Sequence, residues 1–498
     1  MARVTRKGFL IHLPRTRDPH RLGRVVPTLL HISDLHRTSE PRLTNSELIS
    51  AILSDSERWD LEGIPRPDLI VVSGDLIQGA ALDATDPDEL VTAQYGEAED
   101  FLTCLGQELV DSDRSRIVIV PGNHDVHWRR SLNAMKPIRP TPEGIAKRAL
   151  QANSGLRWSW NDQQAYEIAD DPLYASRFQP FREFLTNFYE GIEPNPIVAE
   201  NGDLFFREYP DLDLLVAGFA SWHGNDCFCH VGEIRPESLA ISQKLMATSR
   251  MQTAVAVWHH SISGGPRSQD YMDQRVVHRL VDFGFAIGLH GHQHFPGAAP
   301  FELRLPNLTS MIVVGAGSLA VGDNELPMGE RRQFNVVVID PDSGFVTIHV
   351  RGMSPAGVFT GAHRDDFGGK TFVELKLPPQ KVRGEAHAVA QRLDDATTAI
   401  GNKQYDQALA LLDGLPDRRS TERRQIEIEA LRGLGENAKL IELLNPPQNI
   451  GEVVERVQLL VDARRFDEAM SGLRASEAML PVSTLRDMRE MIAVRRMT

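Results

Sequence analysis

Short apolar runs recur through the first 290 residues of the chain, and most of them end in a polar loop. Each run is four to eight residues long and rich in β-branched residues, a pattern that predicts buried strands. Amphipathic stretches, at 46–58 and 98–110 among others, lie between several runs, and this alternation predicts an α/β domain built of layers. The predicted strands are 25–32, 69–72, 117–120, 214–217, 254–257 and 286–289.

A second set of apolar runs, between residues 311 and 377, predicts further strands that complete the sheet system. Pro378 and Pro379 follow this set and mark a domain boundary. Residues 25–380 are therefore predicted to form one domain. The strands of the second set are 311–314, 334–339, 345–350 and 371–377.

Residues 127–200 interrupt the pattern with a high density of aromatic side chains. This density predicts an inserted helical subdomain that packs over a site formed by the strand ends. Two interpretations remain open, a lid that shapes access for the substrate and a second small core. The aromatic residues are Trp128, Trp158, Trp160, Tyr166, Tyr174, Phe178, Phe181, Phe184, Phe188 and Tyr189.

After residue 383 the chain becomes rich in Ala, Leu, Arg and Glu at helical spacing, which predicts an all-α helical-repeat domain over 383–498. The segment 405–409 recurs as 466–470, with an aromatic residue, an acid and an alanine at matching positions. With 440–444 between them, the spacing is close to the ~34-residue tetratricopeptide period. We expect either a surface that binds a protein partner or a module for packing or self-association.

The 498 residues carry a formal net charge of -14, with 54 Lys plus Arg against 68 Asp plus Glu. This acidity counts against a protein that binds nucleic acid over a large surface, because such proteins are normally basic. Three cysteines indicate a reducing compartment, and no apolar run reaches the ~20 residues that span a bilayer. We therefore expect a cytoplasmic protein with no membrane partner.

Residues 1–24 are an exception to this acidity, since they contain seven basic residues and one acidic residue, Asp18. The apolar stretch at 8–13 is shorter and more polar than the core of about 7–15 residues that a secretory signal requires. We expect a basic amino-terminal arm, either solvated or in contact with a phosphate-rich partner.

Five short polar clusters stand directly after predicted strands. Asp and His are rarely buried unless they are paired or bind a metal, so five clusters in series are hard to explain by packing alone. Because α/β sheets place their sites at the carboxyl ends of the strands, the clusters are expected to lie together. They are Asp34-Leu35-His36, Gly74-Asp75, Gly122-Asn123-His124-Asp125, Trp258-His259-His260 and Gly291-His292-Gln293-His294.

These residue types point to a centre of two metals. Carboxylate and imidazole ligands suit divalent cations, and two ions about 3.5–4 Å apart can clamp an in-line displacement at phosphorus. Asp34 and His36 alternate along an extended segment and project to the same side, and His292 and His294 have the same spacing. Asp75 is the candidate for a carboxylate that bridges the metals. The glycine in three of the clusters lets the backbone turn sharply and approach closely.

The series resembles the calcineurin-like metallophosphoesterase superfamily, whose D-x-H, GD, GNH(D/E), H and GH-x-H motifs occur here in the same order within residues 25–340. The resemblance implies a layered α/β fold, a β-sandwich flanked by helices, and two divalent metal ions, with Mn²⁺ expected ahead of Fe, Zn, Ni or Mg. It implies that one metal is held by Asp34, His36, Asp75 and His294, and the other by Asp75, Asn123, His259 and His292.

The same resemblance implies catalytic roles for two residues. His124 would lie beside the substrate phosphate, where it could protonate the leaving group or stabilise the transition state, and Asp125 would orient His124. A hydroxide that bridges the metals would attack phosphorus. Candidate substrate contacts outside the ligand set are His260, His223 and His127. The segment Cys227-Phe228-Cys229-His230 fits no usual structural zinc site and is interpreted as ordinary thiols.

The leading hypothesis is a phosphodiesterase acting on a cyclic nucleotide or another nucleotide-type substrate, because the motif spacing and the short loops near Asp34 resemble that branch of the superfamily. The alternative is a DNA or RNA nuclease that is recruited as an effector through the helical carboxyl-terminal domain. The acidity weighs against long-duplex binding, which depends on neutralising phosphates. A scaffold without activity is a third hypothesis, and the complete set of ligand residues counts against it.

Overall fold

The computed structural model describes residues 26–378 and 392–497, apart from 141–144, 150–154, 200, 264–269, 303–309, 323, 394, 414 and 416–420. The predicted basic arm at 1–24 and the predicted boundary at Pro379 lie outside the described residues.

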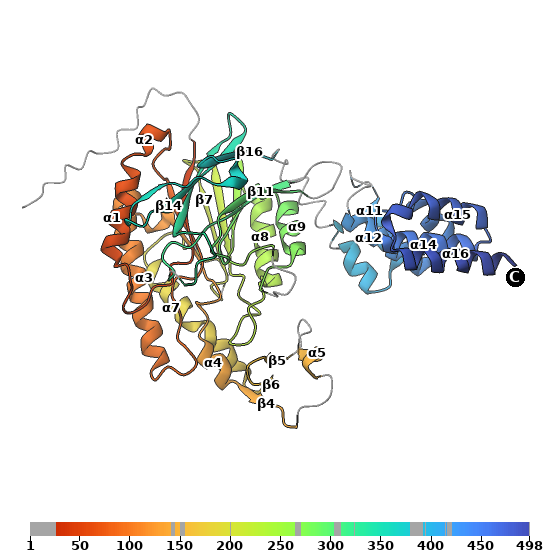
Figure 1. Cartoon of the computed structure of the whole chain (residues 1–498), viewed down its shortest axis with the longest axis horizontal. Coiled ribbons are helices and arrows are strands. Elements are labelled where there is room, and N and C mark those ends of the chain that lie inside the picture. Colours follow the sequence, from red (N-terminus) through yellow and green to blue (C-terminus); the bar gives the residue numbers. More distant parts are fainter. Residues whose placement is uncertain are drawn as a thin grey trace, which may run out of the picture.

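Two sheets pack face to face in the first domain, and helices cover both outer faces (Figure 1). One sheet has the order β15-β14-β13-β1-β2-β3, with β16 beside β14, and β1, β2 and β3 run parallel. The predicted layered α/β sandwich is therefore confirmed. The strands of this sheet are β1 (Thr28–Ile32), β2 (Leu69–Ser73), β3 (Ile117–Val120), β13 (Gln333–Asp340), β14 (Phe345–Met353), β15 (Phe359–Gly361) and β16 (Phe372–Lys376).

The second sheet has the order β11-β12-β10-β9-β8-β7, with β8, β9, β10 and β12 parallel. Its strands β7 and β11 were not predicted, because an edge strand is buried on fewer sides and shows no continuous apolar run. Strand β11 also contains Gly297 and Pro300, which usually mark the edge of a sheet. The strands are β7 (Leu204–Tyr209), β8 (Leu214–Phe219), β9 (Thr253–Val257), β10 (Ile287–His290), β11 (Gly297–Glu302) and β12 (Ser310–Gly315).

The continuous apolar run of β8 is explained by burial on both of its faces. Leu214 and Val216 join the core between the two sheets, whereas Leu215 and Ala217 join a second core beneath helices α8 (Pro236–Thr248) and α9 (Gln274–Phe283). On the opposite side of the sandwich lie α1 (Asn45–Ser56), α2 (Trp59–Glu62) and α3 (Pro87–Leu109). This packing leaves the loops at the carboxyl ends of the parallel strands to form a site.

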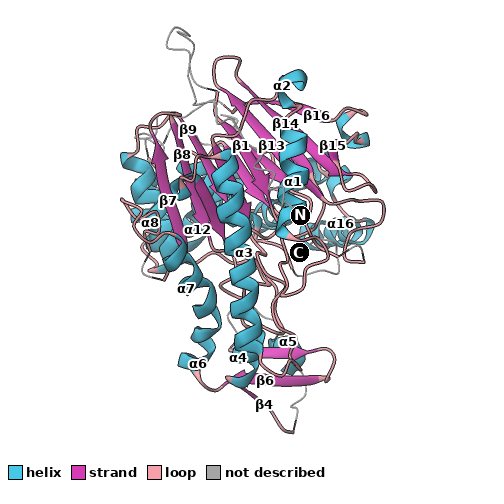
Figure 2. Cartoon of the chain, turned by 90° about the vertical axis from the view of Figure 1, so that its left-hand side faces the viewer, coloured by secondary structure: helices cyan, strands magenta, loops and turns pink. Residues whose placement is uncertain are grey.

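The segment 127–200 differs from the helical insertion that the sequence predicts. It includes a three-stranded antiparallel sheet as well as helices, and Figure 2 shows this sheet at the end of the domain, beyond the two large sheets. The aromatic rings of 178–189 pack into the main core and not over the strand ends. The elements are α4 (Trp128–Asn133), β4 (Met135–Pro137), α5 (Ile145–Ala149), β5 (Leu156–Ser159), β6 (Gln164–Ile168), α6 (Asp171–Ala175) and α7 (Gln179–Phe188).

The carboxyl-terminal region is helical, as predicted. Ala408 and Ala469, which match in the sequence repeat, are both fully buried against neighbouring helices. A likeness to tetratricopeptide repeats stays a prediction. The helices are α11 (Tyr405–Leu412), α12 (Thr421–Leu434), α13 (Asn437–Leu443), α14 (Ile450–Asp462), α15 (Phe466–Ala475) and α16 (Val482–Met497).

Among the described residues, none of the helices combines the length and the apolar composition that crossing a membrane requires.

Candidate metal centre

The loops that follow β1 and β2 run side by side and carry the first predicted ligands. The backbone amide of Asp34 donates to the carbonyl of Gly74 at 3.0 Å, and the amide of His36 donates to the carbonyl of Asp75 at 3.0 Å. These two hydrogen bonds fix Asp34, His36 and Asp75 as neighbours at the carboxyl edge of the first sheet.

Five of the predicted ligands adopt a left-handed backbone conformation, which is uncommon for residues other than glycine. The φ angles are 53° for Asp34, 43° for His36, 52° for Asp75, 79° for His292 and 53° for His294. Such conformations persist only where the surrounding structure enforces them, and they concentrate at functional sites. The loops are therefore shaped to direct these side chains, at some local backbone strain.

The glycines of the predicted motifs make room for ligand side chains. A Cβ atom at Gly122 would overlap Oδ1 of Asp75, and one at Gly291 would overlap the side chain of Ser33 and approach Oδ2 of Asp34. These positions need glycine because the backbone passes too close to the centre to leave room for a side chain, as the sequence predicts.

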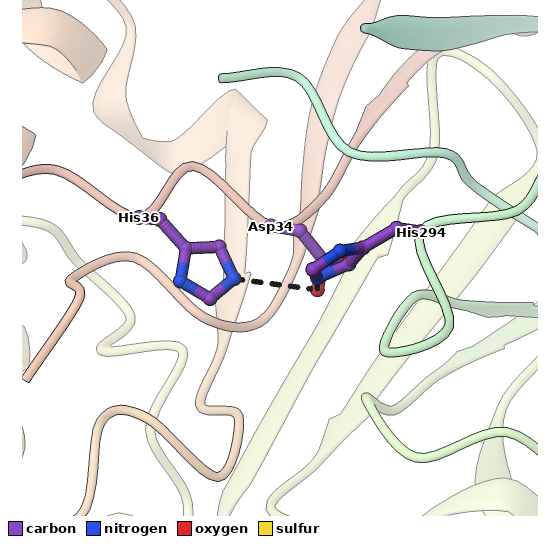
Figure 3. A group of neighbouring side chains, drawn as sticks. All are labelled: Asp34, His36 and His294. Carbon is purple, nitrogen blue, oxygen red and sulfur yellow. Dashed lines mark ion pairs between the residues drawn. The ribbon is translucent and has the colours of Figure 1, made fainter. Parts of the chain in front are cut away.

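One group of candidate ligands consists of Asp34, His36 and His294, which converge in Figure 3. Nε2 of His294 lies 3.3 Å from Oδ1 of Asp34, and Nε2 of His36 lies 3.9 Å from the same oxygen. Nε2 of His36 also lies 3.7 Å from Oδ2 of Asp75, which places Asp75 at the border of this group.

A second group consists of Asp75, His259 and His292, with Asn123 beside them. Nε2 of His259 lies 3.1 Å from Oδ2 of Asp75. Oδ1 of Asn123 lies 3.1 Å from Nε2 of His259 and 2.9 Å from Nδ1 of His292. The structure thus brings all seven predicted ligand residues into two adjoining groups, with Asp75 between them.

Carbonyl and amide oxygens fix the tautomers of the histidines. Nδ1 of His259 lies 2.7 Å from the carbonyl of Ser73, and Nδ1 of His294 lies 3.0 Å from the carbonyl of Glu325. Because a carbonyl only accepts, each Nδ1 carries a proton, and Nε2 is the nitrogen that faces the carboxylates and that the neutral ring can offer to a metal. This is the outer-shell arrangement usual for histidines that bind metal.

The tautomer of His36 is fixed in the same way by Gln78, a residue that was not predicted to take part in the site. Nδ1 of His36 lies 3.0 Å from Oε1 of Gln78. The backbone carbonyl oxygen of Gln78 also lies 2.8 Å from Nδ1 of His124. Gln78 therefore orients two histidines of the centre, and no motif in the sequence marks such an outer-shell role.

The electrostatics of the centre favour cations. Burial by itself would raise the pKa of Asp75 and of Asp34, but the surrounding histidines hold both pKa values well below the usual range. Burial lowers the pKa of His259 and of His294, yet the neighbouring carboxylates outweigh it and raise each pKa to about 9. In the absence of other cations, protons on these histidines balance the buried carboxylates.

His124 lies beside the centre, as predicted, whereas Asp125 does not have its predicted role. The backbone amide of His124 donates to Oδ1 of Asp75 at 2.8 Å, and burial lowers the pKa of its imidazole to about 4. The carboxylate of Asp125 instead accepts from the amide of Gly122 at 2.8 Å and from the hydroxyl of Tyr95 at 3.3 Å. Asp125 braces the loop, and the carbonyl of Gln78 orients His124.

The predicted substrate contacts His127 and His260 need correction. Nδ1 of His127 accepts the amide of Arg130 at the start of α4, and its Nε2 lies 3.3 Å from Asp88, so this buried ring is a helix cap. His260 is fully buried, with Nδ1 2.8 Å from the hydroxyl of Ser221 and its ring 4.9 Å from that of His292. It lies behind the ligand histidines and supports them.

His223, the third predicted contact, is half-buried on the loop that follows β8. Its backbone carbonyl accepts from Arg177 at 2.9 Å, and its amide donates to the carbonyl of Glu233 at 3.1 Å. The charges that act most strongly on its ring are those of Arg235 and Glu233. These contacts tie His223 to the base of its loop and do not place it among the ligand groups.

The residues present fit divalent metals. Nε2 of His36 is buried without a hydrogen-bond partner among the described residues, although two carboxylates lie just beyond hydrogen-bond reach. Buried polar atoms without partners are costly, and a cation between imidazole and carboxylate would satisfy them. The donor set of carboxylates, imidazoles and one amide oxygen suits first-row divalent ions.

The comparison with protein families agrees with this geometry. The model of the calcineurin-like phosphoesterase family matches residues 27–296, more than half of the chain. A search of curated proteins finds no match. Among solved structures, PhoD is 9% identical with a TM-score of 0.40, covering 76% of this chain and 78% of its own. The calcineurin-like phosphoesterase YfkN from Bacillus subtilis is 13% identical with a TM-score of 0.28, covering 78% of this chain and 99% of its own.

Proposed function

The chain belongs to the calcineurin-like phosphoesterase family, and we propose that its substrate is a phosphodiester, either a cyclic nucleotide or a related nucleotide. Membership makes the protein a metal-dependent phosphoric ester hydrolase, and the fold of this family uses a binuclear metal centre. The observation that carries the proposal is the pair of adjoining ligand groups that meet at Asp75.

The ligand residues divide between two metal positions. We assign Asp34, His36 and His294 to one metal and Asn123, His259 and His292 to the other, with Asp75 shared. When bound, the metals supply charge neutralisation at phosphorus and lower the pKa of water at the site. We propose Mn²⁺ ahead of Fe, Zn, Ni or Mg, since the mixed oxygen and nitrogen donors exclude none of them.

His124 is the residue we assign to the leaving group. Its Nδ1 proton is held by the carbonyl of Gln78, and its backbone amide is held by Asp75, so its Nε2 is directed to one place. A negatively charged phosphate beside Nε2 would raise the pKa of this ring and load it with a proton. His124 could then pass that proton to the departing oxygen, a contribution worth about 10²–10⁴-fold.

A resemblance in the sequence supports a diester. The motif spacing and the short loops near Asp34 resemble the cyclic-nucleotide branch of the family.

We also propose a cytoplasmic location and a protein partner for the helical carboxyl-terminal region. All three cysteines are free, which fits a reducing compartment. The helices α11 to α16 bury repeated small and apolar positions between neighbours, as stacked repeats that bind partners do.

The proposal is tested by assaying the full chain with Mn²⁺ on bis-p-nitrophenyl phosphate, p-nitrophenyl phosphate, cyclic nucleotides, DNA and RNA. We expect hydrolysis of the diesters and of a cyclic nucleotide, and its loss in Asp75→Ala and His124→Ala. His278→Ala serves as the control, because His278 lies on α9 against Phe301. Cleavage of nucleic acid but of no cyclic nucleotide would overturn the substrate assignment, and a metal-loaded protein that hydrolyses nothing would favour a scaffold.

A further inference from the structure

The loop 222–231, which follows β8, is clamped by residues of the inserted segment. Asp226 is fully buried at its centre. Its Oδ2 accepts from the hydroxyl of Tyr174 at 2.6 Å and from Nε of Arg157, and its Oδ1 accepts the amides of Phe228 and Cys229 at 2.8 and 3.0 Å. A buried carboxylate with this many partners holds the loop in one conformation.

A second contact from the same segment holds the other half of the loop. Nε and Nη2 of Arg177 donate to the carbonyls of Asn225 and His223 at 2.8 and 2.9 Å. The guanidinium also stacks on the ring of Tyr174, 3.6 Å from its centroid. The insertion, expected from the sequence to be a lid or a separate core, thus acts as a support for this loop.

The clamp presents His230 beside the metal centre. The ring of Trp128 lies 5.4 Å from that of His124 on one side and 5.7 Å from that of His230 on the other. His230 is also close enough to His292 and Asp75 for their charges to act on its pKa. Trp128 thus connects the leaving-group histidine, His124, to His230, which lies near the second ligand group.

Two polar atoms of these rings are buried without a hydrogen-bond partner in the part of the chain that the structure describes. They are Nε1 of Trp128 and Nδ1 of His230. Indole N–H groups and imidazole nitrogens usually find a partner when they are buried. Both residues are only partly buried, so part of their surface can contact a planar ligand, and beneath it lie one obligate donor and one nitrogen that can donate or accept.

We propose that Trp128 and His230 form a subsite for the heterocyclic base of a nucleotide substrate, and that Asp226 is the residue that positions His230. The inference rests on the proposed phosphodiesterase function. A base is planar and carries both acceptors and donors on its edge, so it matches the ring surface and the two free polar atoms. The sugar and phosphate would then extend past His124 to the metals.

The experiment measures competitive inhibition of bis-p-nitrophenyl phosphate hydrolysis by AMP, by ribose 5-phosphate and by inorganic phosphate. For the unchanged protein we expect AMP to inhibit about tenfold or more strongly than ribose 5-phosphate, because a stacked base adds affinity of that order. Trp128→Leu and His230→Ala should remove most of this ratio and leave inhibition by inorganic phosphate unchanged.

Matched variants separate the subsite from general damage. Trp160→Leu changes a tryptophan of the same segment whose residue is 65% exposed, and it should keep the ratio. Tyr174→Phe removes one hydrogen bond from Asp226 without removing a charge, and it should lower the ratio less than His230→Ala does. Thermal unfolding of each variant checks that it folds.

The outcomes distinguish the two proposals. If the protein hydrolyses bis-p-nitrophenyl phosphate but AMP and ribose 5-phosphate inhibit it equally, the phosphodiesterase function stands and the base subsite is refuted. An unchanged ratio in both Trp128→Leu and His230→Ala also refutes the subsite. If the protein hydrolyses nothing, the proposed function is refuted. Calorimetric titration of the metal-loaded protein with AMP and with ribose 5-phosphate then tests the subsite separately, and equal affinities would refute it.

Discussion

Nε2 of His259 lies 3.1 Å from Oδ2 of Asp75, so the carboxylate between the two ligand groups meets a histidine from the second sheet. The other oxygen, Oδ1, accepts the amide of His124. One side chain thus connects the ligand groups to the residue assigned to the leaving group.

Replacing Asp75 by Asn tests this relationship with little change of shape. The amide oxygen of Asn can still accept the His124 amide, but the charge and one ligand atom are lost. We expect metal affinity to fall by more than the roughly 10–100-fold that loss of an outer-shell partner costs, and turnover to fall with it. Metal titration and steady-state assays measure both, with exposed Asp88→Asn as the control. Turnover near that of the unchanged protein would contradict the shared-ligand role.

Gln78 provides a test of the outer shell. Gln78→Ala removes the acceptor for Nδ1 of His36 and leaves the backbone carbonyl that holds His124. We expect metal affinity to fall by about 10–100-fold, since the tautomer and the ring orientation of His36 are no longer fixed. Gln78→Glu keeps an acceptor and should restore most of the affinity. Equal affinities for the two variants would show that Gln78 does not orient His36.

The sequence predicts the strands that carry continuous or alternating apolar runs, including β3 and β16 at the edges of the first sheet, and misses the edge strands β7, β11 and β15. Val71 in β2 and Val216 in β8 lie within continuous apolar runs because each sheet is covered on both sides. Edge strand β7 exposes part of its length and has a mixed pattern. In the inserted segment, aromatic density alone does not reveal which core the rings join, and those of Phe181 and Phe188 join the main one.

The ligand residues were predictable because metal chemistry restricts them to a few side-chain types at short, fixed spacing. Their supporting partners were not, since several are backbone carbonyls, as for His259 with Ser73 and His294 with Glu325. A carbonyl is present at every position and leaves no mark in the sequence. The role of Asp125 was missed for a related reason, because its partners include a backbone amide.

Gly122→Ala should inactivate the centre without removing any ligand. The added Cβ would overlap Oδ1 of Asp75 and displace that side chain. We expect weaker metal binding and a loss of turnover comparable to that of Asp75→Asn. Gly96→Ala is the matched control, because Gly96 lies on α3 with open space around it, and it should stabilise the fold by about 0.5–1 kcal/mol. Normal metal affinity in Gly122→Ala would contradict the steric argument.

A buried ion pair far from the centre tests what holds the domain together. Arg351 is 1% exposed, and it donates to both oxygens of Asp55 at 2.8 and 2.7 Å. Arg351→Ala leaves the buried Asp55 carboxylate without its main partner, so the free energy of unfolding should fall by about 3–5 kcal/mol. Arg275→Ala, which breaks an exposed pair with Asp273, should change it by less than about 1 kcal/mol. Urea unfolding of both variants measures the difference.

Binding of metal should release protons, and the amount should depend on pH. His259 and His294 have pKa values of about 9 because Asp75 and Asp34 lie beside them, so both are protonated in the metal-free protein at pH 7. Since a metal binds only the neutral imidazole, it must displace about two protons at pH 7 and few above pH 10. Apparent affinity for Mn²⁺ should therefore rise as the pH increases from 7 to 9.

The stability of the metal-free protein should change in the opposite direction. A histidine whose pKa is raised by folding stabilises the folded state fully below its unfolded pKa near 6.5, and this contribution is lost as the pH rises through 9.

Calorimetry in buffers of different ionisation enthalpy measures the protons that metal binding releases, and His294→Gln should lower their number by about one. Metal binding with no buffer dependence at pH 7 would show that carboxylates and protonated histidines do not pair in the metal-free centre. In that case the rise of affinity between pH 7 and 9 should also be absent.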